Sequence, residues 1–307
     1  MEATADAANR VGLFRKDATA QGVAKQRLIE TIAGEEKRVI HDPYADYFVK
    51  GASLVKCLGH SAQIWLLNKM LPGMHEHLIA RTRAIDDLVT ECAAAGAVQY
   101  VILGAGYDMR AYRLTLGSLK VFEVDQLEVQ ELKKANMPAD ALASGKVTHV
   151  SVDFNTQTLT EQLTKAGFEA GRPTIVTLEG VTQYIPHAST AATIREMGAL
   201  CGPGSTLFLS YVDERFATAP AELVGRGYPK PEAALRMISG LAAKFGEPWI
   251  ALYSASQLAT TLSSCGFEVT SDTCFEDVNE AYFGAVGRLV PPELTLNLER
   301  FAVAKKK

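Results

Sequence analysis

After Gly96, short apolar runs alternate with stretches of helical periodicity, and this alternation restricts the fold more than any other feature of the chain. Five apolar runs lie at residues 98–103, 119–124, 147–152, 174–178 and 206–211. Segments with helical spacing separate them, among them 126–136, 159–166 and 189–200. Strands that alternate with helices form βαβ units, which build a parallel sheet with helices on both faces. The sequence therefore predicts an α/β fold of the Rossmann-like type.

The regions on either side of this alternation have a different pattern. The N-terminal third has helical spacing over three stretches, 19–32, 54–70 and 74–95. Near the C-terminus, a helical stretch and two strands with a long connection between them are expected over 255–265, 267–271 and 300–304. We therefore divide the chain into an N-terminal helical lid segment over 1–96, an α/β core over 97–212, a cap insertion over 213–250 and the C-terminal part of the core over 251–307.

Composition excludes several classes of protein. The 307 residues carry a net charge of −4, which disfavours nucleic-acid binding because a phosphate backbone attracts a basic face. No window approaches the roughly 20 apolar residues that cross a bilayer, and the N-terminus resembles neither a signal nor a transit peptide, so we expect a cytoplasmic protein without membrane contact. The five cysteines lack C-x-x-C spacing, which predicts reduced thiols, no zinc site and a core position for Cys92, Cys201 and Cys265.

The first candidate binding element is the turn Gly104-Ala105-Gly106, which follows the first apolar run. Glycines let the backbone turn sharply and let a ligand approach closely, although a Gly-x-Gly alone often only makes a tight turn. The dinucleotide pattern needs a third glycine, and Arg110 stands near that place. The turn therefore favours a ligand with a small amino-acid end over a ligand with a diphosphate.

Acidic residues follow the next strands. Asp125 lies about 20 residues beyond the turn, the spacing at which a carboxylate accepts hydrogen bonds from ribose hydroxyls. Glu123 is the second choice for this role, and a helix N-cap is the alternative interpretation of Asp125. Asp153 and Phe154 follow the third strand and could hold an adenine, or form a turn. Glu179 follows the fourth strand, where a carboxylate faces the binding crevice and could hold an ammonium group.

Together these stretches resemble a known family. The matching segments are 41–46, 80–87, 103–114, 122–125 and 173–184, and they span most of residues 17 to 211. By them the chain resembles the leucine carboxyl methyltransferase family, including the tetracenomycin-pathway carboxyl methyltransferase branch. The resemblance implies a class I S-adenosylmethionine (SAM)-dependent methyltransferase with a mostly parallel seven-stranded sheet and an N-terminal helical addition. Beyond residue 211 the resemblance is thin.

The resemblance also implies site residues, and SAM as the cofactor. Arg81 would bind the SAM carboxylate, which a guanidinium grips bidentately, unless it forms a surface salt bridge with Asp86 or Asp87. Lys25 or Arg27 could supply a second cation. The remaining contacts follow the order of the strands: Gly104 and its turn under the methionine, Asp125 at the ribose, Asp153 and Phe154 at the adenine, and Glu179 at the amino group.

The acceptor side has weaker signals. An ionised carboxylate acceptor needs no general base, whereas a hydroxyl is helped by one. The candidate catalytic residues are His187 and Tyr184, and the six histidines form no triad or metal-ligand spacing. Tyr184 and Tyr211 could line the acceptor pocket or pack in the core. The same holds for four aromatic residues near the expected cap, Tyr228, Phe245, Trp249 and Tyr253.

The sequence therefore predicts a SAM-dependent O-methyltransferase of a small molecule, with a carboxylate or a hydroxyl of a secondary metabolite as the acceptor. We favour the carboxylate because no convincing base emerges. A protein C-terminal carboxyl methyltransferase, a nicotinamide-dependent oxidoreductase and a non-catalytic SAM-binding module are the alternatives, and the missing third glycine counts against the oxidoreductase. No metal is expected, and the sequence makes no prediction of oligomeric state.

Overall fold

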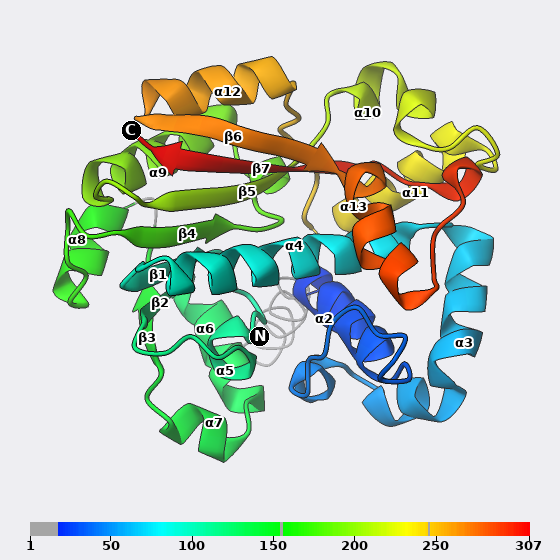
Figure 1. The fold of residues 1–307 in the computed structure, drawn as a ribbon, viewed down its shortest axis with the longest axis horizontal. Helices are drawn as coiled ribbons and strands as arrows, with labels where there is room; N and C mark the ends of the chain where they lie inside the picture. Colours follow the sequence, from blue (N-terminus) through cyan, green and yellow to red (C-terminus); the bar gives the residue numbers. More distant parts are fainter. Residues whose placement is uncertain (1–17, 154–155, 245) are drawn as a thin grey trace, which may run out of the picture.

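A computed structural model describes residues 18–153, 156–244 and 246–307 of the chain, and its centre is one seven-stranded sheet (Figure 1). The strands in chain order are β1 (Gln99–Leu103), β2 (Lys120–Asp125), β3 (Val147–Ser151), β4 (Thr174–Leu178), β5 (Thr206–Val212), β6 (Phe267–Cys274) and β7 (Glu299–Lys306). Their order across the sheet is β3-β2-β1-β4-β5-β7-β6. The first five predicted strands agree with the structure to within one residue at each end.

The pairing of the strands is mostly parallel. β1 to β5 pair in parallel, and β7 is antiparallel to both of its neighbours, β5 and β6. β1 and β4 are buried along their whole length, as expected for central parallel strands covered on both faces. The predicted α/β fold with a mostly parallel seven-stranded sheet is confirmed.

The helices are distributed over both faces of the sheet. The α-helices are α2 (Ala18–Thr31), α3 (Ala52–Met70), α4 (Met74–Ala94), α5 (Arg110–Arg113), α6 (Leu127–Asn136), α7 (Ala139–Ala143), α8 (Leu159–Lys165), α9 (His187–Leu200), α10 (Arg215–Thr218), α11 (Pro231–Lys244), α12 (Ala255–Ser264) and α13 (Phe275–Tyr282). Five short 3-10 helices complete the described elements: η1 (Ala45–Phe48), η2 (Thr182–Tyr184), η3 (Pro220–Leu223), η4 (Gly284–Val286) and η5 (Pro292–Leu294). Hydroxyl caps begin two of the helices, since Thr158 accepts the Glu161 amide at α8 and Ser254 accepts the Gln257 amide at α12.

Side-chain alternation along β1 divides the core into two layers. Tyr100 and Ile102 face a cluster that includes residues of α2, α4 and α13, and Figure 1 shows α4 lying along this face. Val101 and Leu103 face a second cluster that includes residues of α8, α9 and α12. Cys92 belongs to the first cluster and Cys201 and Cys265 to the second, which confirms their predicted core positions.

The segment between β5 and α12 has a small core of its own. It contains α10, η3 and α11, and its buried cluster includes Leu223, Leu235 and Ile238, packed with Leu296 and Leu298 from just before β7. This segment therefore packs on residues that precede β7.

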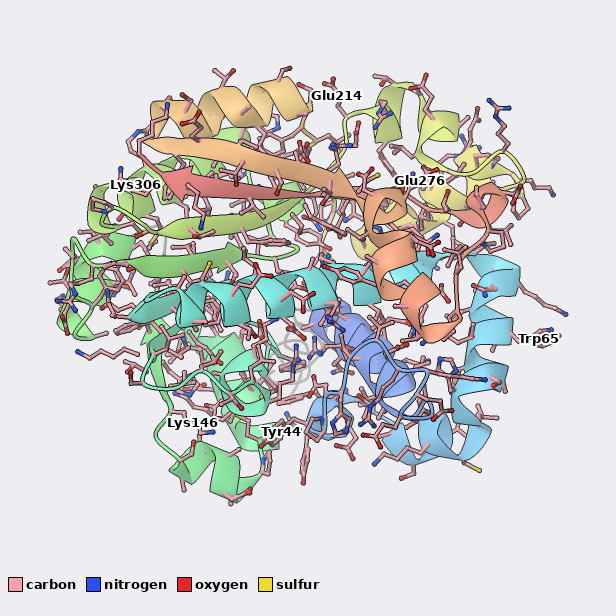
Figure 2. The ribbon with its side chains drawn as sticks, in the orientation of Figure 1. Tyr44, Trp65, Lys146, Glu214, Glu276 and Lys306 are labelled. Carbon is pink, nitrogen blue, oxygen red and sulfur yellow. The ribbon has the colours of Figure 1, made fainter. Side chains whose placement is uncertain are left out.

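The outer side of the N-terminal helices is partly apolar. Trp65 projects from α3 at the edge of the molecule and is 61% exposed (Figure 2). Gly59 interrupts α3 with a φ of +73°, which places a kink in the helix. Among the described helices, none combines the length and the apolar character that a membrane span requires.

Candidate functional site

A cavity of about 950 Å³ opens at the carboxyl ends of β1, β2 and β4. Three sequence segments bring polar groups to it: the turn after β1, Asp125 at the end of β2, and Glu179 after β4. We call these the strand-end residues. A second set of lining residues, the apolar wall, comes from the residue that follows α3, the N-terminus of α4 and the segment between β5 and α12: Leu71, Met74, Leu78, Ile238, Leu241, Trp249 and Ile250. A crevice at the carboxyl ends of parallel strands is where open α/β sheets bind ligands.

The glycine turn is held in a conformation that requires glycine. Gly104 and Gly106 have φ values of +66° and +44°, in the left-handed region that L side chains rarely adopt. A Cβ on Gly104 would also lie 2.5 Å from Val181 Cγ2. The turn therefore stays narrow, and its backbone faces the cavity.

Asp125 organises this turn through its carboxylate. Its Oδ2 accepts the Gly106 amide at 2.7 Å, and its Oδ1 accepts the Gln126 amide at 2.7 Å. Burial raises the pKa of Asp125, against the lowering effect of these two amides. The N-cap of α6 is Gln126, without a side-chain cap, so the N-cap interpretation of Asp125 is wrong. Glu123, the second choice, is buried against Lys133 Nζ at 2.7 Å and is not among the residues that line the cavity.

Glu179 lies between two buried arginines. Its Oε1 accepts Arg81 Nε at 3.0 Å, and its Oε2 accepts Arg110 Nη1 at 2.6 Å. Burial disfavours the charged carboxylate, but Arg110 and Arg81 outweigh it and lower the pKa of Glu179. The carboxylate is thus fixed as an anion at the cavity, with its side chain 17% exposed.

Arg81 faces the cavity rather than solvent. Besides Glu179, it donates to Glu299 Oε2 through Nη1. The alternative of a surface salt bridge is wrong, because Asp86 pairs with Arg110 and Arg113, and Asp87 pairs with Arg83. These two bonds use two of the five N–H groups of the guanidinium, which leaves donors for a ligand anion.

Of the two candidates for a second cation, the structure brings only Arg27 to the cavity. Its Nε donates to Asp42 Oδ2 at 2.7 Å and its Nη2 donates to the Tyr107 carbonyl at 2.6 Å. Lys25 is exposed and is not among the lining residues. Arg27 therefore ties α2 to the loop that follows the glycine turn.

Several predicted residues lie away from the cavity. Asp153 is exposed after β3 and is not among the lining residues, and Phe154 lies outside the described residues. His187 begins α9, where Nε2 lies 2.8 Å from the Leu252 carbonyl oxygen and the ring contacts Tyr253. Tyr211 is fully buried and donates to Asp272 at 2.6 Å, so it packs within the sheet.

Of the aromatic residues predicted for the acceptor pocket, Tyr184 and Trp249 line the cavity. Burial raises the pKa of Tyr184, so its hydroxyl stays protonated at neutral pH. Trp249 packs against Phe216, with ring centroids 5.0 Å apart. Tyr228 and Tyr253 are buried in hydrophobic clusters, and Phe245 lies outside the described residues.

Sequence reasoning missed three charged or titratable residues of the site. Arg110 was interpreted only as a missing glycine, yet it pairs with Asp86, Asp108 and Glu179. Glu299 and His77 line the cavity, with His77 Nε2 3.4 Å from Glu299 Oε2. The helical spacing of His77 and Arg81 places both on one face of α4, which is a usable signal. Glu299 comes from distant β7, where no local pattern indicated a site.

Solved structures share the fold. A DUF574 family protein of Streptomyces avermitilis has a TM-score of 0.56 at 16% identity, covering 92% of this chain and 97% of that protein. A candidate methyltransferase of Thermobifida fusca has a TM-score of 0.54 at 16% identity, covering 92% and 94%. With the sheet order and the cavity, these define a class I SAM-dependent methyltransferase fold.

Sequence comparison defines the family. The sequence pattern described as leucine carboxyl methyltransferase matches residues 20–198. A candidate SAM-dependent methyltransferase of Rhodococcus jostii is 37% identical over 203 residues, which cover 65% of each chain. Another, of Mycolicibacterium smegmatis, is 34% identical over 69% of this chain and 70% of the relative. A third, of Mycolicibacterium paratuberculosis, is 28% identical over 89% and 88%. The chain belongs to the leucine carboxyl methyltransferase family of SAM-dependent methyltransferases.

Proposed function

We propose that this cavity binds SAM through the strand-end residues and transfers its methyl group to the carboxylate of a small apolar molecule. The supporting observation is a pair of opposite charges beside the glycine turn: Arg81 for the carboxylate of the methionine portion and Glu179 for its ammonium. Each oxygen of Asp125 accepts one amide and retains a lone pair for a ribose hydroxyl. Asp153 and Phe154 remain predictions for the adenine.

The chemistry of the transfer places modest demands on the protein. When bound, SAM supplies a methyl group already activated on a sulfonium. The chain must then align the acceptor and exclude water, which raises the rate by positioning. The apolar wall suits this task, because Met74, Ile238 and Trp249 present hydrophobic surface to an acceptor.

A carboxylate acceptor agrees with the groups that line the cavity. It is ionised at neutral pH and needs no general base. Among the described lining residues, His77 is the only histidine, and its Nε2 is directed at Glu299. The name of the family, which refers to a carboxyl group, supports the same acceptor chemistry.

Transfer from methyl-labelled SAM to a panel of apolar carboxylic acids and matched alcohols tests this proposal. We expect label in the methyl ester of one of the acids. Mild alkali should release this label as methanol, because a methyl ester hydrolyses and a methyl ether does not. Alkali-stable label would contradict the carboxylate acceptor. Label found only on a protein C-terminus would support a protein methyltransferase, and SAM binding without transfer to any acceptor would support a non-catalytic module.

The position of His77 favours a hydroxyl acceptor as a second candidate function. A His–Glu pair at a cavity can act as a general base, with Glu299 orienting the imidazole. For such an acceptor, His77→Gln should lower kcat by about 100-fold or more, with little change in KM for SAM. His187→Gln is the matched control, since His187 lies outside the cavity lining. An unchanged kcat in His77→Gln would exclude the base.

A further inference from the structure

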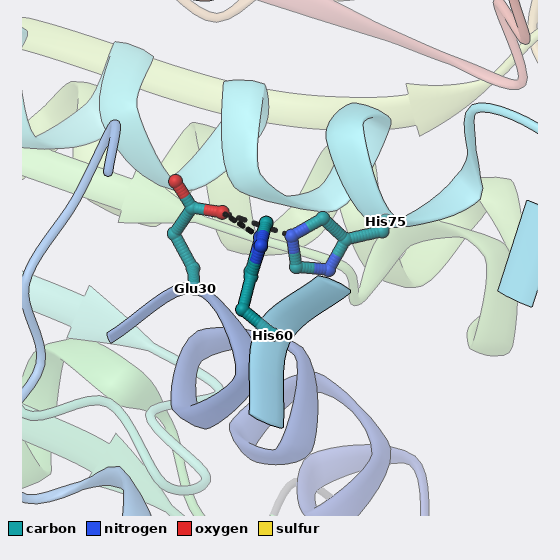
Figure 3. Close-up of side chains that lie close together, drawn as sticks. All are labelled: Glu30, His60 and His75. Carbon is teal, nitrogen blue, oxygen red and sulfur yellow. Dashed lines mark hydrogen bonds and ion pairs between the residues drawn. The ribbon is translucent and has the colours of Figure 1, made fainter. Parts of the chain in front are cut away.

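Away from the cavity, three ligand-type side chains converge between the N-terminal helices: Glu30 of α2, His60 of α3 and His75 of α4 (Figure 3). One donor atom from each lies within 4.8 Å of the others. Glu30 Oε2 is 2.9 Å from His75 Nε2 and 3.9 Å from His60 Nε2. Glu30 and His75 are buried, at 0% and 1% exposure. Residues 30, 60 and 75 are far apart along the sequence, which explains why the sequence shows no metal-ligand pattern.

Hydrogen bonds outside this cluster orient two of its members. Gln26 Oε1 lies 2.8 Å from His75 Nδ1, so it can hold the ring with Nε2 directed at the cluster. The other oxygen of the carboxylate, Glu30 Oε1, accepts the Val39 amide at 2.6 Å and Arg288 Nη1 at 2.7 Å. Metal-binding histidines and carboxylates are commonly oriented by such second partners.

His60 contributes the unsatisfied group. Its Nε2 is buried and has no hydrogen-bond partner among the described residues, although it points at Glu30 (Figure 3). A buried polar nitrogen without a partner costs about 1–3 kcal/mol, so the site is incomplete as it stands. Two imidazoles and one carboxylate form a ligand set that zinc enzymes use, with a fourth position for water.

We propose that Glu30, His60 and His75 bind one Zn²⁺ ion. Zinc–nitrogen and zinc–oxygen bonds of about 2.0–2.1 Å in tetrahedral geometry place ligand atoms roughly 3.3 Å apart. The two separations from Glu30 Oε2, 2.9 and 3.9 Å, lie on either side of that value, and the donor atoms of the two histidines lie within 4.8 Å of each other. The ion replaces the proton that bridges His75 Nε2 and Glu30 Oε2, and this proton is released to solvent.

The ion would tie together three helices, and two of them, α2 and α4, carry part of the cavity. α2 supplies Gln26 and Arg27 to the lining, and α4 supplies His77 and Arg81. α3 has its kink at Gly59, directly before His60, so the position of this ligand depends on how the two halves of α3 meet. We therefore expect Zn²⁺ to stiffen the helical side of the cavity and to raise the melting temperature of the protein.

Zinc binding to the full-length, untagged protein tests the proposal. After removal of metal with EDTA, the protein is dialysed against Zn²⁺, desalted and analysed by atomic emission. We expect about one ion per chain, and at least about a 100-fold loss of affinity in His60→Gln and in His75→Gln. His41→Gln is the matched control, because His41 is an exposed histidine outside the cluster and should bind as wild type. No retained zinc in the wild type, or wild-type affinity in His60→Gln, would overturn the site.

A second pair of measurements covers the case in which a ligand variant folds poorly. Gln26→Leu leaves all three ligands in place and should lower the zinc affinity by about 10- to 100-fold. Cobalt(II) bound to the wild type should show the intense visible absorption of a tetrahedral ion. A weak octahedral spectrum, or a Gln26→Leu variant with unchanged affinity, would contradict the proposed geometry.

Discussion

The strand-end residues and the apolar wall line one cavity, but they are built in different ways. The strand-end residues lie at the carboxyl ends of β1, β2 and β4, and buried ion pairs with Arg81 and Arg110 hold Glu179 in place. The wall combines α4 with residues more than 150 positions later in the chain. The family pattern covers residues 20–198 and ends before Ile238 and Trp249. The difference teaches that one cavity combines strand ends that lie within the family pattern with a wall that draws in part on residues after it.

The largest effect should come from breaking the ion pairs under the strand-end residues. Arg110→Met removes one buried partner from each of Asp86, Asp108 and Glu179, and leaves Asp86 with Arg113 and Glu179 with Arg81, so the free energy of unfolding should fall by about 3–5 kcal/mol in urea denaturation. The control is Arg236→Met, which breaks an exposed pair with Glu232 and should cost at most about 1 kcal/mol. Equal losses in the two variants would show that the buried ion pairs contribute no more to the free energy of unfolding than an exposed pair does.

Acid should weaken the link between these ion pairs and β7. Arg81 and His77 lower the pKa of Glu299 from 4.5 to about 2, despite its burial. A carboxylate with a lowered folded pKa stabilises the fold above its unfolded pKa, and this contribution is lost as the pH falls from about 4.5 towards 2. The loss amounts to about 3 kcal/mol for this group. In urea melts, Glu299→Gln should be less stable at neutral pH and decline less in acid; a decline as steep as that of the wild type would refute the assignment.

A moderate effect should follow at the glycine turn. Gly104→Ala combines left-handed strain of about 1–2 kcal/mol with a contact to Val181, so it should lose more stability than strain alone explains. Gly145→Ala isolates the strain, because Gly145 has a φ of +63° and open space around it. The stability lost through Gly104→Ala should therefore be smaller in a Val181→Ala background than in the wild type. Equal losses in the two backgrounds, measured by urea denaturation, would rule out the steric account.

The smallest effect should appear at the wall. Trp249→Ala removes apolar surface from the wall on which we propose that the acceptor binds, so KM for the acceptor should rise by about tenfold, the equivalent of about 1.4 kcal/mol, while KM for SAM stays unchanged. Steady-state kinetics with each substrate varied in turn separates these constants. A rise in KM for SAM alone would show that Trp249 contacts SAM and not the acceptor.

The same contrast explains what could be predicted from sequence. The strands, the glycine turn and the placement of Asp125, Glu179 and Arg81 at the cavity follow from local patterns and from the family resemblance. His187 was the favoured histidine because it follows the β4 loop, but its ring turns to Leu252 and Tyr253 instead. His77 and Glu299 meet only through the pairing of β7 beside β5 and the packing of α4 on the sheet. Contacts of this kind depend on tertiary structure and leave no local signal.

The proposed division of the cavity, with SAM on the strand-end residues and the acceptor on the apolar wall, is tested most directly by calorimetric titration of SAM into three proteins: the wild type, Asp125→Asn and Trp249→Ala. The Asn amide oxygen can still accept the Gly106 amide, but the charge that would strengthen hydrogen bonds to the ribose is lost. We expect Asp125→Asn to bind SAM about 10- to 100-fold more weakly and Trp249→Ala to bind it as the wild type does. Unchanged affinity in Asp125→Asn, or a larger loss in Trp249→Ala, would contradict the account.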